Sequence, residues 1–540
     1  MRVNLKNLKK ISFRSIFWLL FYIFIFTLCL HNSSSYLDPD FGWHLKMGEE
    51  IITTQSVPHI NTINYTLAGE RWVDHEWLAE SFLYQANKTF GYTGVEIIFS
   101  LLIVLIFVIL NHFIARRFSQ NKNDLYLIMP FEIFGLMSIL PSAGVRLQEI
   151  GLLFFLLLLL IIYRYEQNKK YQTLLWLLPL LYLWSCLHGT FLIAFFILAL
   201  FGGAKIIEAI LYQKWPDLFF GYADVFNKKQ IITLAAFSLG PFSLTFLTPY
   251  GSKLYSFLIG YSNTYYLTAI SEWLPQWFFP YNYQQLFYIS FVAATIILSV
   301  YSSLSKRRKI NLPELIMLFV FTILALKSRR HTQLLVIISL PFIFNFCRDF
   351  LEITIPEQKN KPSSISNKLS QLFVITVLLV TIGGKLILNQ PIAEPFKQFC
   401  GDYPCAAIEY LKSNPQYNED RIYNAYAWGG FMIWTYPTKQ LFIDGRMPQI
   451  AYEKYTILQE YKSFYDPAQV AEKISKHNIK LFLLSSQGEK IRLNWAEKYI
   501  FRLDEAKINS QPDALKEYLN NNSAWKIIYS DNISVIYAKK

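Results

Sequence analysis

The segments IFWLLFYIFIFTLCL (residues 16–30) and YLDPDFGWHLK (residues 36–46) together decide the fold. The first is an apolar run of the kind that crosses a membrane as a helix, for which about 20 mostly apolar residues are needed. Five cations precede it: Arg2, Lys6, Lys9, Lys10 and Arg14. No small-residue cleavage site follows it. We therefore expect a retained signal anchor with a cytoplasmic N-terminus.

The rest of the chain continues this apolar character. Its 540 residues are 53% hydrophobic with a mean hydropathy of +0.26, which is more apolar surface than one soluble core can bury. We predict a mainly α fold, a polytopic transmembrane bundle of about eleven spans. The expected spans are 16–30, 95–114, 125–141, 148–164, 172–188, 190–211, 231–248, 284–303, 312–327, 331–347 and 370–388.

The net charge of +13 is distributed as a topology signal. The basic residues form short clusters beside apolar runs rather than one basic face, so no nucleic-acid partner is expected. Four clusters share one side of the membrane by the positive-inside rule: Arg116 with Arg117, Arg164 with Lys169 and Lys170, Lys228 with Lys229, and Lys306 to Lys309. This predicts a multi-pass protein of the cell inner (plasma) membrane.

In this register, three segments lie outside, the last of them long enough for a domain. We expect a cytoplasmic N-terminus and first span at 1–31, a first extracytoplasmic loop at 32–93, the bundle at 94–388, and an extracytoplasmic α/β domain at 389–540. Its pattern predicts strands at 421–423, 440–444 and 480–485, a helix at 467–477, and a hairpin of 525–529 with 533–537. Cys400 and Cys405 in this domain are either a short-loop disulfide or two free thiols.

The first outer loop carries the most chemistry. Asp38, Asp40 and His44 follow the first span directly, and Pro39 favours an extended or turn geometry in which both carboxylates face one metal ion or one hydroxyl. His75 and Glu76 form a second group, at the expected start of a helix. Solvated acidic residues after a span are the alternative, but charges clustered with Trp and His at a bundle mouth favour a site.

Several cations depart from the charge rule, because the same register places them outside. They are Arg146 and the group Lys327, Arg329, Arg330 and His331. Such exceptions often mark sites. Alternatively, they are interfacial cations that bind anionic lipid headgroups. His188, near an outer span end, is either a helix-terminal histidine or part of the site.

These motifs resemble the GT-C superfamily of integral-membrane glycosyltransferases, most closely a little-characterised bacterial branch. The resemblance rests on Asp38-Pro39-Asp40-Phe41-Gly42-Trp43-His44, Pro58-His59-Ile60-Asn61-Thr62-Ile63-Asn64-Tyr65 and Trp72-Val73-Asp74-His75-Glu76-Trp77-Leu78-Ala79-Glu80. Further short motifs that match are Leu187-His188-Gly189, Thr248-Pro249-Tyr250-Gly251, Glu272-Trp273, Arg329-Arg330-His331, Trp428-Gly429-Gly430 and Ile443-Asp444-Gly445-Arg446.

The resemblance implies transfer of a sugar from a polyprenyl-phosphate donor to an envelope glycan, lipid or protein acceptor on the extracytoplasmic face. Asp38 or Asp40 would be the general base. A divalent metal (Mg or Mn), where one is used, would take Asp40 and His44. Substrate and leaving phosphate would contact the remaining charged residues: His44, His75, Glu76, Arg146, His188, Arg329, Arg330 and His331.

Departures from better-known relatives limit the resemblance. Protein mannosyltransferases show Asp-Glu where this chain has Asp38-Pro39-Asp40, and the Trp-Trp-Asp signature of oligosaccharyltransferases is absent. The donor sugar and the acceptor therefore do not carry over. A transporter is disfavoured because the central apolar runs are nearly uninterrupted. The alternative function is a non-catalytic membrane anchoring or assembly protein of the envelope.

Overall fold

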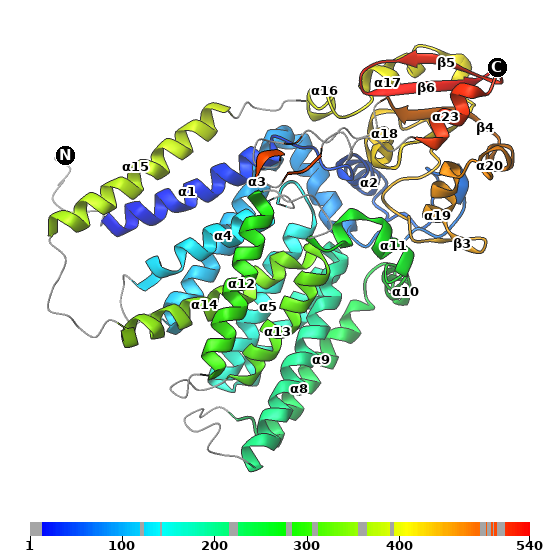
Figure 1. The fold of residues 1–540 in the computed structure, drawn as a ribbon. Coiled ribbons are helices and arrows are strands. Elements are labelled where there is room, and N and C mark those ends of the chain that lie inside the picture. The colour runs from blue at the N-terminus through cyan, green and yellow to red at the C-terminus, as the bar shows by residue number, and fades with distance from the viewer. Residues whose placement is uncertain are drawn as a thin grey trace, which may run out of the picture.

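The computed structural model describes residues 13–118, 124–140, 143–214, 225–276, 283–304, 311–354, 364–388, 394–486, 493, 498–500, 502–504 and 513–540. These residues form a helix bundle with a small α/β domain at one end, as Figure 1 shows. We call the end of the bundle that carries this domain the domain end.

Five helices are long and apolar enough to cross a membrane, and they run through Ser15–Ser33, Trp77–Phe118, Gln148–Asn168, Gly189–Lys214 and Arg329–Arg348. Shorter apolar helices accompany them within the described part of the chain. Each of the eleven expected spans falls on a helix, so the mainly helical, multi-pass character is confirmed. The number of spans stays a prediction, because length and composition single out only five of these helices.

The bundle helices are α1 (Phe13–Ser33), α3 (Trp77–Phe118), α4 (Met129–Ile139), α5 (Gln148–Asn168), α6 (Tyr171–Leu174), α7 (Leu177–Leu187), α8 (Leu192–Lys214), α9 (Lys228–Thr245), α12 (Tyr283–Leu304), α13 (Leu312–Lys327), α14 (Thr332–Thr354) and α15 (Ser364–Leu388). Short helices at the domain end are α2 (Phe41–Thr54), α10 (Ser252–Gly260) and α11 (Thr264–Ala269).

Helix α3 is bent at Gly91, whose φ of 68° lies in the left-handed region that glycine adopts without a steric penalty. The bend separates about the first four turns of the helix, which belong to the first loop, from the apolar part that follows. Helix α2 packs against α3 and against the C-terminal helix α18 (Gly429–Thr435). The first loop is therefore a folded, mostly helical unit placed between the bundle and the C-terminal domain.

The C-terminal domain has a four-stranded sheet in the order β1 (Arg421–Asn424), β4 (Ile479–Ser485), β6 (Ser534–Lys539), β5 (Trp525–Ser530). Strands β1 and β4 are parallel, while β4 with β6 and β5 with β6 are antiparallel. The expected α/β character and the C-terminal hairpin are confirmed. The other elements are α16 (Pro395–Gln398), α17 (Cys405–Lys412), β2 (Ala451–Tyr452), β3 (Tyr455–Thr456), α19 (Ile457–Lys462), α20 (Val470–His477) and α23 (Ala514–Asn521).

The predicted strand at 440–444 is wrong. Only Leu441 makes a β-bridge, and its partner is Asn64 of the first loop rather than a strand of the sheet. The Leu441 amide donates to the Ile63 carbonyl at 3.0 Å, and the Tyr65 amide donates to the Leu441 carbonyl at 3.1 Å. Because this backbone is already paired with the first loop, it does not extend the domain's sheet.

The turn that follows holds the domain to the first loop through one buried arginine. Arg446 pairs with Asp444 at 2.8 Å, and its Nη2 also donates to Asn61 at 3.0 Å and to Asn64 at 2.9 Å. Arg446 is 2% exposed. The Asp444-Gly445-Arg446 motif is therefore an ion-paired turn that fixes the domain to the loop.

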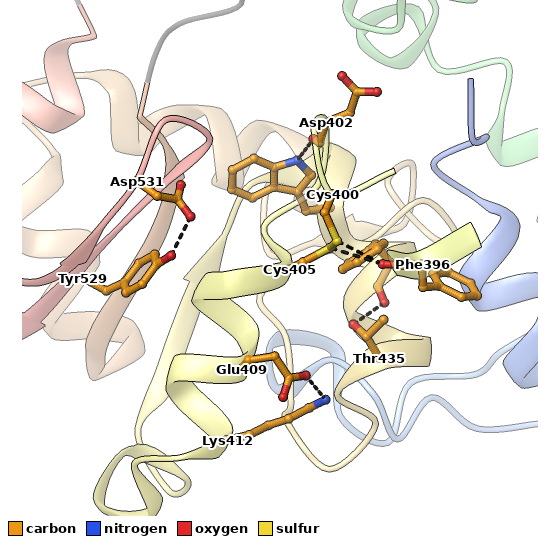
Figure 2. The surroundings of a disulfide bond; sticks show 11 residues. Phe396, Cys400, Asp402, Cys405, Glu409, Lys412, Thr435, Tyr529 and Asp531 are labelled. Atoms are coloured by element: carbon orange, nitrogen blue, oxygen red, sulfur yellow. Dashed lines mark hydrogen bonds and ion pairs between the residues drawn. A yellow bond between two sulfur atoms is a disulfide. The ribbon is translucent and has the colours of Figure 1, made fainter. Parts of the chain in front are cut away.

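Cys400 and Cys405 form a disulfide at the start of the domain, which decides between the two alternatives left by the sequence. Figure 2 shows the bond beside Phe396, with the Glu409–Lys412 ion pair one turn further along α17. The carboxylate of Asp402, in the loop that the bond closes, is exposed and turned away from it. Disulfides persist in oxidising compartments, in keeping with an extracytoplasmic domain.

Candidate active site

The Asp38-Pro39-Asp40 turn leads directly into α2. The Asp40 amide donates to Asp38 Oδ1 at 2.9 Å, which closes a local turn of the kind that aspartate favours. Asp40 occupies the N-cap position of α2, but its side chain makes no capping hydrogen bond. Instead, Asp40 Oδ1 accepts from the indole Nε1 of Trp43 at 2.8 Å. The second carboxylate oxygen of Asp40 is left available.

The C-terminal domain lies close against this turn, and glycine makes the approach feasible. A Cβ on Gly430 would lie 2.2 Å from the Pro39 carbonyl oxygen, and a Cβ on Gly445 would lie 2.2 Å from Asp40 Oδ1. Neither distance is sterically allowed, so a larger residue at either position would push the domain off the turn. This explains why Trp428-Gly429-Gly430 and Asp444-Gly445-Arg446 accompany the Asp-Pro-Asp motif in one sequence.

A chain of four charged side chains starts at the same turn. Asp38 Oδ2 lies 2.6 Å from Arg146 Nε, Arg146 Nη1 lies 2.5 Å from Glu272 Oε1, and Glu272 Oε2 lies 3.2 Å from Arg330 Nη1. The guanidinium of Arg330 also lies 5.0 Å from the centre of the Trp273 ring, in a cation–π contact. Two arginines and two carboxylates from four separate elements therefore meet at the domain end.

Burial and charge set different protonation states along this chain. Burial alone would raise the pKa of Glu272, but Arg146 and Arg330 outweigh it and hold the pKa at about 2. Burial, followed by the repulsion of Asp38, raises the pKa of Asp40 to about 7, although the hydrogen bond from Trp43 opposes the rise. Asp40 therefore has the pKa of a group that can both accept and release a proton near neutral pH.

A cluster of histidines and carboxylates forms the opposite wall. His188 Nε2 lies 2.8 Å from Glu76 Oε1, and His75 Nε2 lies 3.8 Å from the same oxygen. His44 Nδ1 lies 2.8 Å from Glu80 Oε1 and 3.7 Å from Glu76 Oε2. His188 ends α7, and its Nδ1 accepts from the Thr190 amide at 3.0 Å. It is thus a helix-terminal histidine and a member of this cluster at once.

The cluster is deeply buried, and burial shifts the pKa of several of its members. Burial lowers the pKa of His44 to about 4 and also lowers the pKa of His75. Burial and then the charge of Asp74 raise the pKa of Glu80 well above its ordinary value. The pKa of Glu76 is lowered instead, because His188 and His75 outweigh its burial.

These groups line one cavity of about 280 Å³. Eight of the ten site residues predicted from the sequence line it: Asp38, Asp40, His44, His75, Glu76, Arg146, His188 and Arg330. Gly445 of the C-terminal domain closes one side, and Tyr261, Tyr266 and Trp273 add aromatic faces. The cavity thus lies where the bundle, the first loop and the C-terminal domain meet.

Arg329 and His331, the other two predicted residues, do not line this cavity. The short turn Arg329–His331 directs Arg330 to Glu272, while the His331 ring packs near Trp273, with 5.9 Å between ring centres. Glu272 was missing from the predicted site residues. Its signal was present as an acidic residue beside Trp273 in the second of the three outer segments, residues 249–283, but one carboxylate in a loop does not reveal two arginine partners.

The geometry also changes the predicted metal ligands. His44, Glu76 and Glu80 place one ligand atom each within 4.8 Å of one another, so these three would hold a divalent cation. Asp40 does not belong to this group. One imidazole with two carboxylates suits Mn²⁺ or Zn²⁺ better than Mg²⁺, which prefers all-oxygen ligands. Because burial raises the pKa of Glu80, a proton would compete with the metal for this carboxylate, and metal affinity would rise with pH.

No protein-family model matches the sequence, and no curated protein matches it. The structure is similar to the crystal structure of an Archaeoglobus fulgidus oligosaccharyltransferase tethered with an acceptor peptide containing the NVT sequon. The TM-score is 0.53 at 13% identity, over 98% of this chain and 74% of that chain. The apo form of the same enzyme gives 0.47, and its complex with an inhibitory peptide and a dolichol-phosphate gives 0.49, both at 12% identity over 98% and 75% of the two chains.

At this level of identity, the likeness to the peptide-tethered enzyme establishes the fold and not the activity. That oligosaccharyltransferase is a GT-C membrane glycosyltransferase. The predicted resemblance is therefore confirmed at the level of the fold, which this chain shares with that oligosaccharyltransferase.

Proposed function

We propose that this protein is a membrane glycosyltransferase that moves a sugar from a polyprenyl-phosphate donor to an acceptor hydroxyl, in the cavity at the domain end. One observation carries the proposal. A carboxylate with a pKa of about 7, Asp40, lines the same cavity as two arginines that are already arranged around an anion, the Glu272 carboxylate. The GT-C fold supports the same reading.

The chemistry requires a base and a place for the leaving phosphate. Asp40 would remove the proton of the acceptor hydroxyl while the hydroxyl oxygen bonds to the anomeric carbon of the sugar. The bond from that carbon to the phosphate oxygen breaks, and its electron pair leaves with the phosphate. Arg146 and Arg330 would stabilise the growing phosphate charge, because guanidinium groups match phosphate oxygens in geometry and charge. The proton then passes from Asp40 to solvent.

Asp38 would have a different role from Asp40. Its Oδ2 is bound to Arg146 at 2.6 Å, so it orients this arginine rather than accepting a proton from the acceptor. This division assigns the base to Asp40, which the sequence had left open between the two. His44, Glu76 and Glu80 could hold a divalent cation, which would supply a Lewis acid to the same cavity.

The proposed reaction takes place on the extracytoplasmic face. The Cys400–Cys405 disulfide supports this side for the C-terminal domain, since such bonds persist in oxidising compartments. The basic clusters at 116–117, 164–170 and 228–229 support the cytoplasm for the other end of the bundle. The donor would then be a lipid-linked sugar of the outer leaflet.

The test measures polyprenyl phosphate released by the purified protein in nanodiscs, given a panel of polyprenyl-phosphate sugars and an envelope lipid extract. Wild type is compared with Asp40→Asn and with Asp402→Asn, which changes an exposed carboxylate of the same domain end. Release in wild type and Asp402→Asn, but not in Asp40→Asn, would support the proposal. Release from none of the donors would favour the anchoring protein, and release indifferent to Asp40 would refute its role as the base.

A further inference from the structure

A second, separate cavity lies at the opposite end of the bundle. Helix α5 begins at the candidate active site, since Arg146, Leu147 and Gln148 line that cavity. At 1.5 Å per residue, its last residue, Asn168, lies about 30 Å away, which is the thickness of the hydrocarbon core of a bilayer. There, α5, α6 and α7 enclose a cavity of about 890 Å³.

The walls of this groove are apolar and run along one face of each helix. Helix α7 and the residue before it contribute Trp176, Pro179, Leu180 and Leu183, which follow the i, i+3, i+4, i+7 spacing of a single helix face. Helix α5 contributes Phe154, Leu157, Leu160 and Ile161. From Phe154 to Arg164 the helix rises about 15 Å, half of the hydrocarbon core. The groove therefore spans the depth of one leaflet.

The end of the groove farthest from the C-terminal domain is polar and positively charged. Arg164 and Lys170 line it there, together with Asn168 and Gln172. Arg164 and Lys170 are exposed, and neither forms an ion pair with a carboxylate in the described parts of the chain. Trp176, 68% exposed, lies at the same level. Aromatic side chains with a polar edge are favoured at this depth, where lipid headgroups begin.

We propose that this groove binds an anionic phospholipid of the leaflet opposite the C-terminal domain. The acyl chains would lie along the apolar faces of α5 and α7, and the phosphate would contact Arg164 and Lys170. Basic pockets between transmembrane helices bind anionic lipid headgroups in this way. The unpaired cations favour an anionic lipid over a zwitterionic one and over an apolar partner helix, which would leave both charges unsatisfied.

The two helices of the groove also carry active-site residues at their other ends. Phe154 in the groove wall packs near Trp184, with 6.0 Å between ring centres. The Trp184 indole donates to Thr190 Oγ1 at 3.1 Å, and this hydroxyl lies 3.0 Å from His188 Nδ1. A bound lipid would thus pack on the same helix pair that positions His188 at Glu76.

The experiment compares the whole protein in detergent, titrated with phosphatidylglycerol or phosphatidylcholine and followed by native mass spectrometry. The double variant Arg164→Gln, Lys170→Gln removes the charges, and Leu180→Trp fills the groove. The matched control is Lys228→Gln, Lys229→Gln, which removes two exposed cations from the same end of the bundle without touching the groove.

We expect wild type and the control to bind phosphatidylglycerol more tightly than phosphatidylcholine, and the charge variant to bind it about thirtyfold more weakly. Leu180→Trp, which fills the groove from a largely buried position, should lose the bound lipid. Equal affinity of wild type and charge variant for phosphatidylglycerol, or equal affinity of wild type for both lipids, would overturn the proposal. So would a copurifying protein whose binding excludes lipid from the groove.

Discussion

Substitution of Asp40 by asparagine is the sharpest test of the proposed chemistry. Asparagine keeps the shape of the side chain and can still accept from the Trp43 indole through its carbonyl oxygen, but it cannot take up a proton. Loss of a general base costs about 10²-fold to 10⁴-fold in rate. We expect a fall of this size in the rate of polyprenyl phosphate release, with an unchanged thermal unfolding temperature.

The pH dependence of activity tests the role of Asp40 as the base in a second, independent way. A base must be ionised to act, so activity should rise as pH increases through the pKa of Asp40, which is about 7. A single group with this pKa is about one-tenth ionised at pH 6 and about nine-tenths ionised at pH 8, so kcat/KM should rise about tenfold between them. Trp43→Phe removes a hydrogen bond that lowers the pKa, and should move the rise to higher pH.

The assay measures kcat/KM for release of polyprenyl phosphate in nanodiscs between pH 5 and pH 9, for wild type, both variants and the Asp402→Asn control. The reasoning fails if the acidic limb persists unchanged in Asp40→Asn, since another group would then be titrating. It also fails if Trp43→Phe moves the limb to lower pH, because the indole would then not stabilise the ionised carboxylate.

Three further predictions follow from the site and the domain. Arg330→Gln should lower kcat/KM by about 10²-fold, because it loses a charge-assisted contact to the leaving phosphate. Arg329→Gln, outside the cavity, should lower kcat/KM far less. Equal losses in steady-state assays would contradict this contrast. Removal of divalent cations with EDTA should lower the release of polyprenyl phosphate, and Mn²⁺ should restore it. Glu76→Gln should weaken Mn²⁺ binding in electron paramagnetic resonance titrations. Activity indifferent to EDTA would exclude a metal role. The double change Cys400→Ser, Cys405→Ser should destabilise the C-terminal domain by about 2 kcal/mol, the chain-entropy value for so short a loop; an unchanged thermal unfolding curve under reducing and non-reducing conditions would refute it.

The sequence allowed much of the local structure to be predicted. Apolar runs of membrane-spanning length follow from composition alone, because backbone polar groups in lipid must pair within a helix. The Asp38-Pro39-Asp40 turn could be predicted for a similar reason, since proline restricts the residue before it and aspartate closes short turns. The hairpin of β5 and β6 followed from alternating apolar residues around Asp531.

The strand expected at 440–444 shows where such reasoning fails. Its residues have the apolar pattern of a strand, and they are buried as a strand would be. The backbone of Leu441, however, pairs with the first loop, more than 300 residues earlier in the chain, and Phe442 and Ile443 bond to the side chain of Asn424. A local pattern predicts that a segment is extended and buried, but it does not predict which backbone pairs with it.

The sequence by itself therefore determined the membrane bundle, the C-terminal α/β domain and most of the charged residues of the site, because these depend on local apolar periodicity and on unusual charges beside spans. Only the tertiary structure decided how these residues pair. Glu272 lies 126 residues from Arg146 and 58 from Arg330, and it joins them because three helix ends meet at the domain end. Arg329 and Arg330 are neighbours in the sequence, yet successive side chains of the 3₁₀ helix Arg329–His331 differ in direction by about 120°, so only Arg330 lines the cavity.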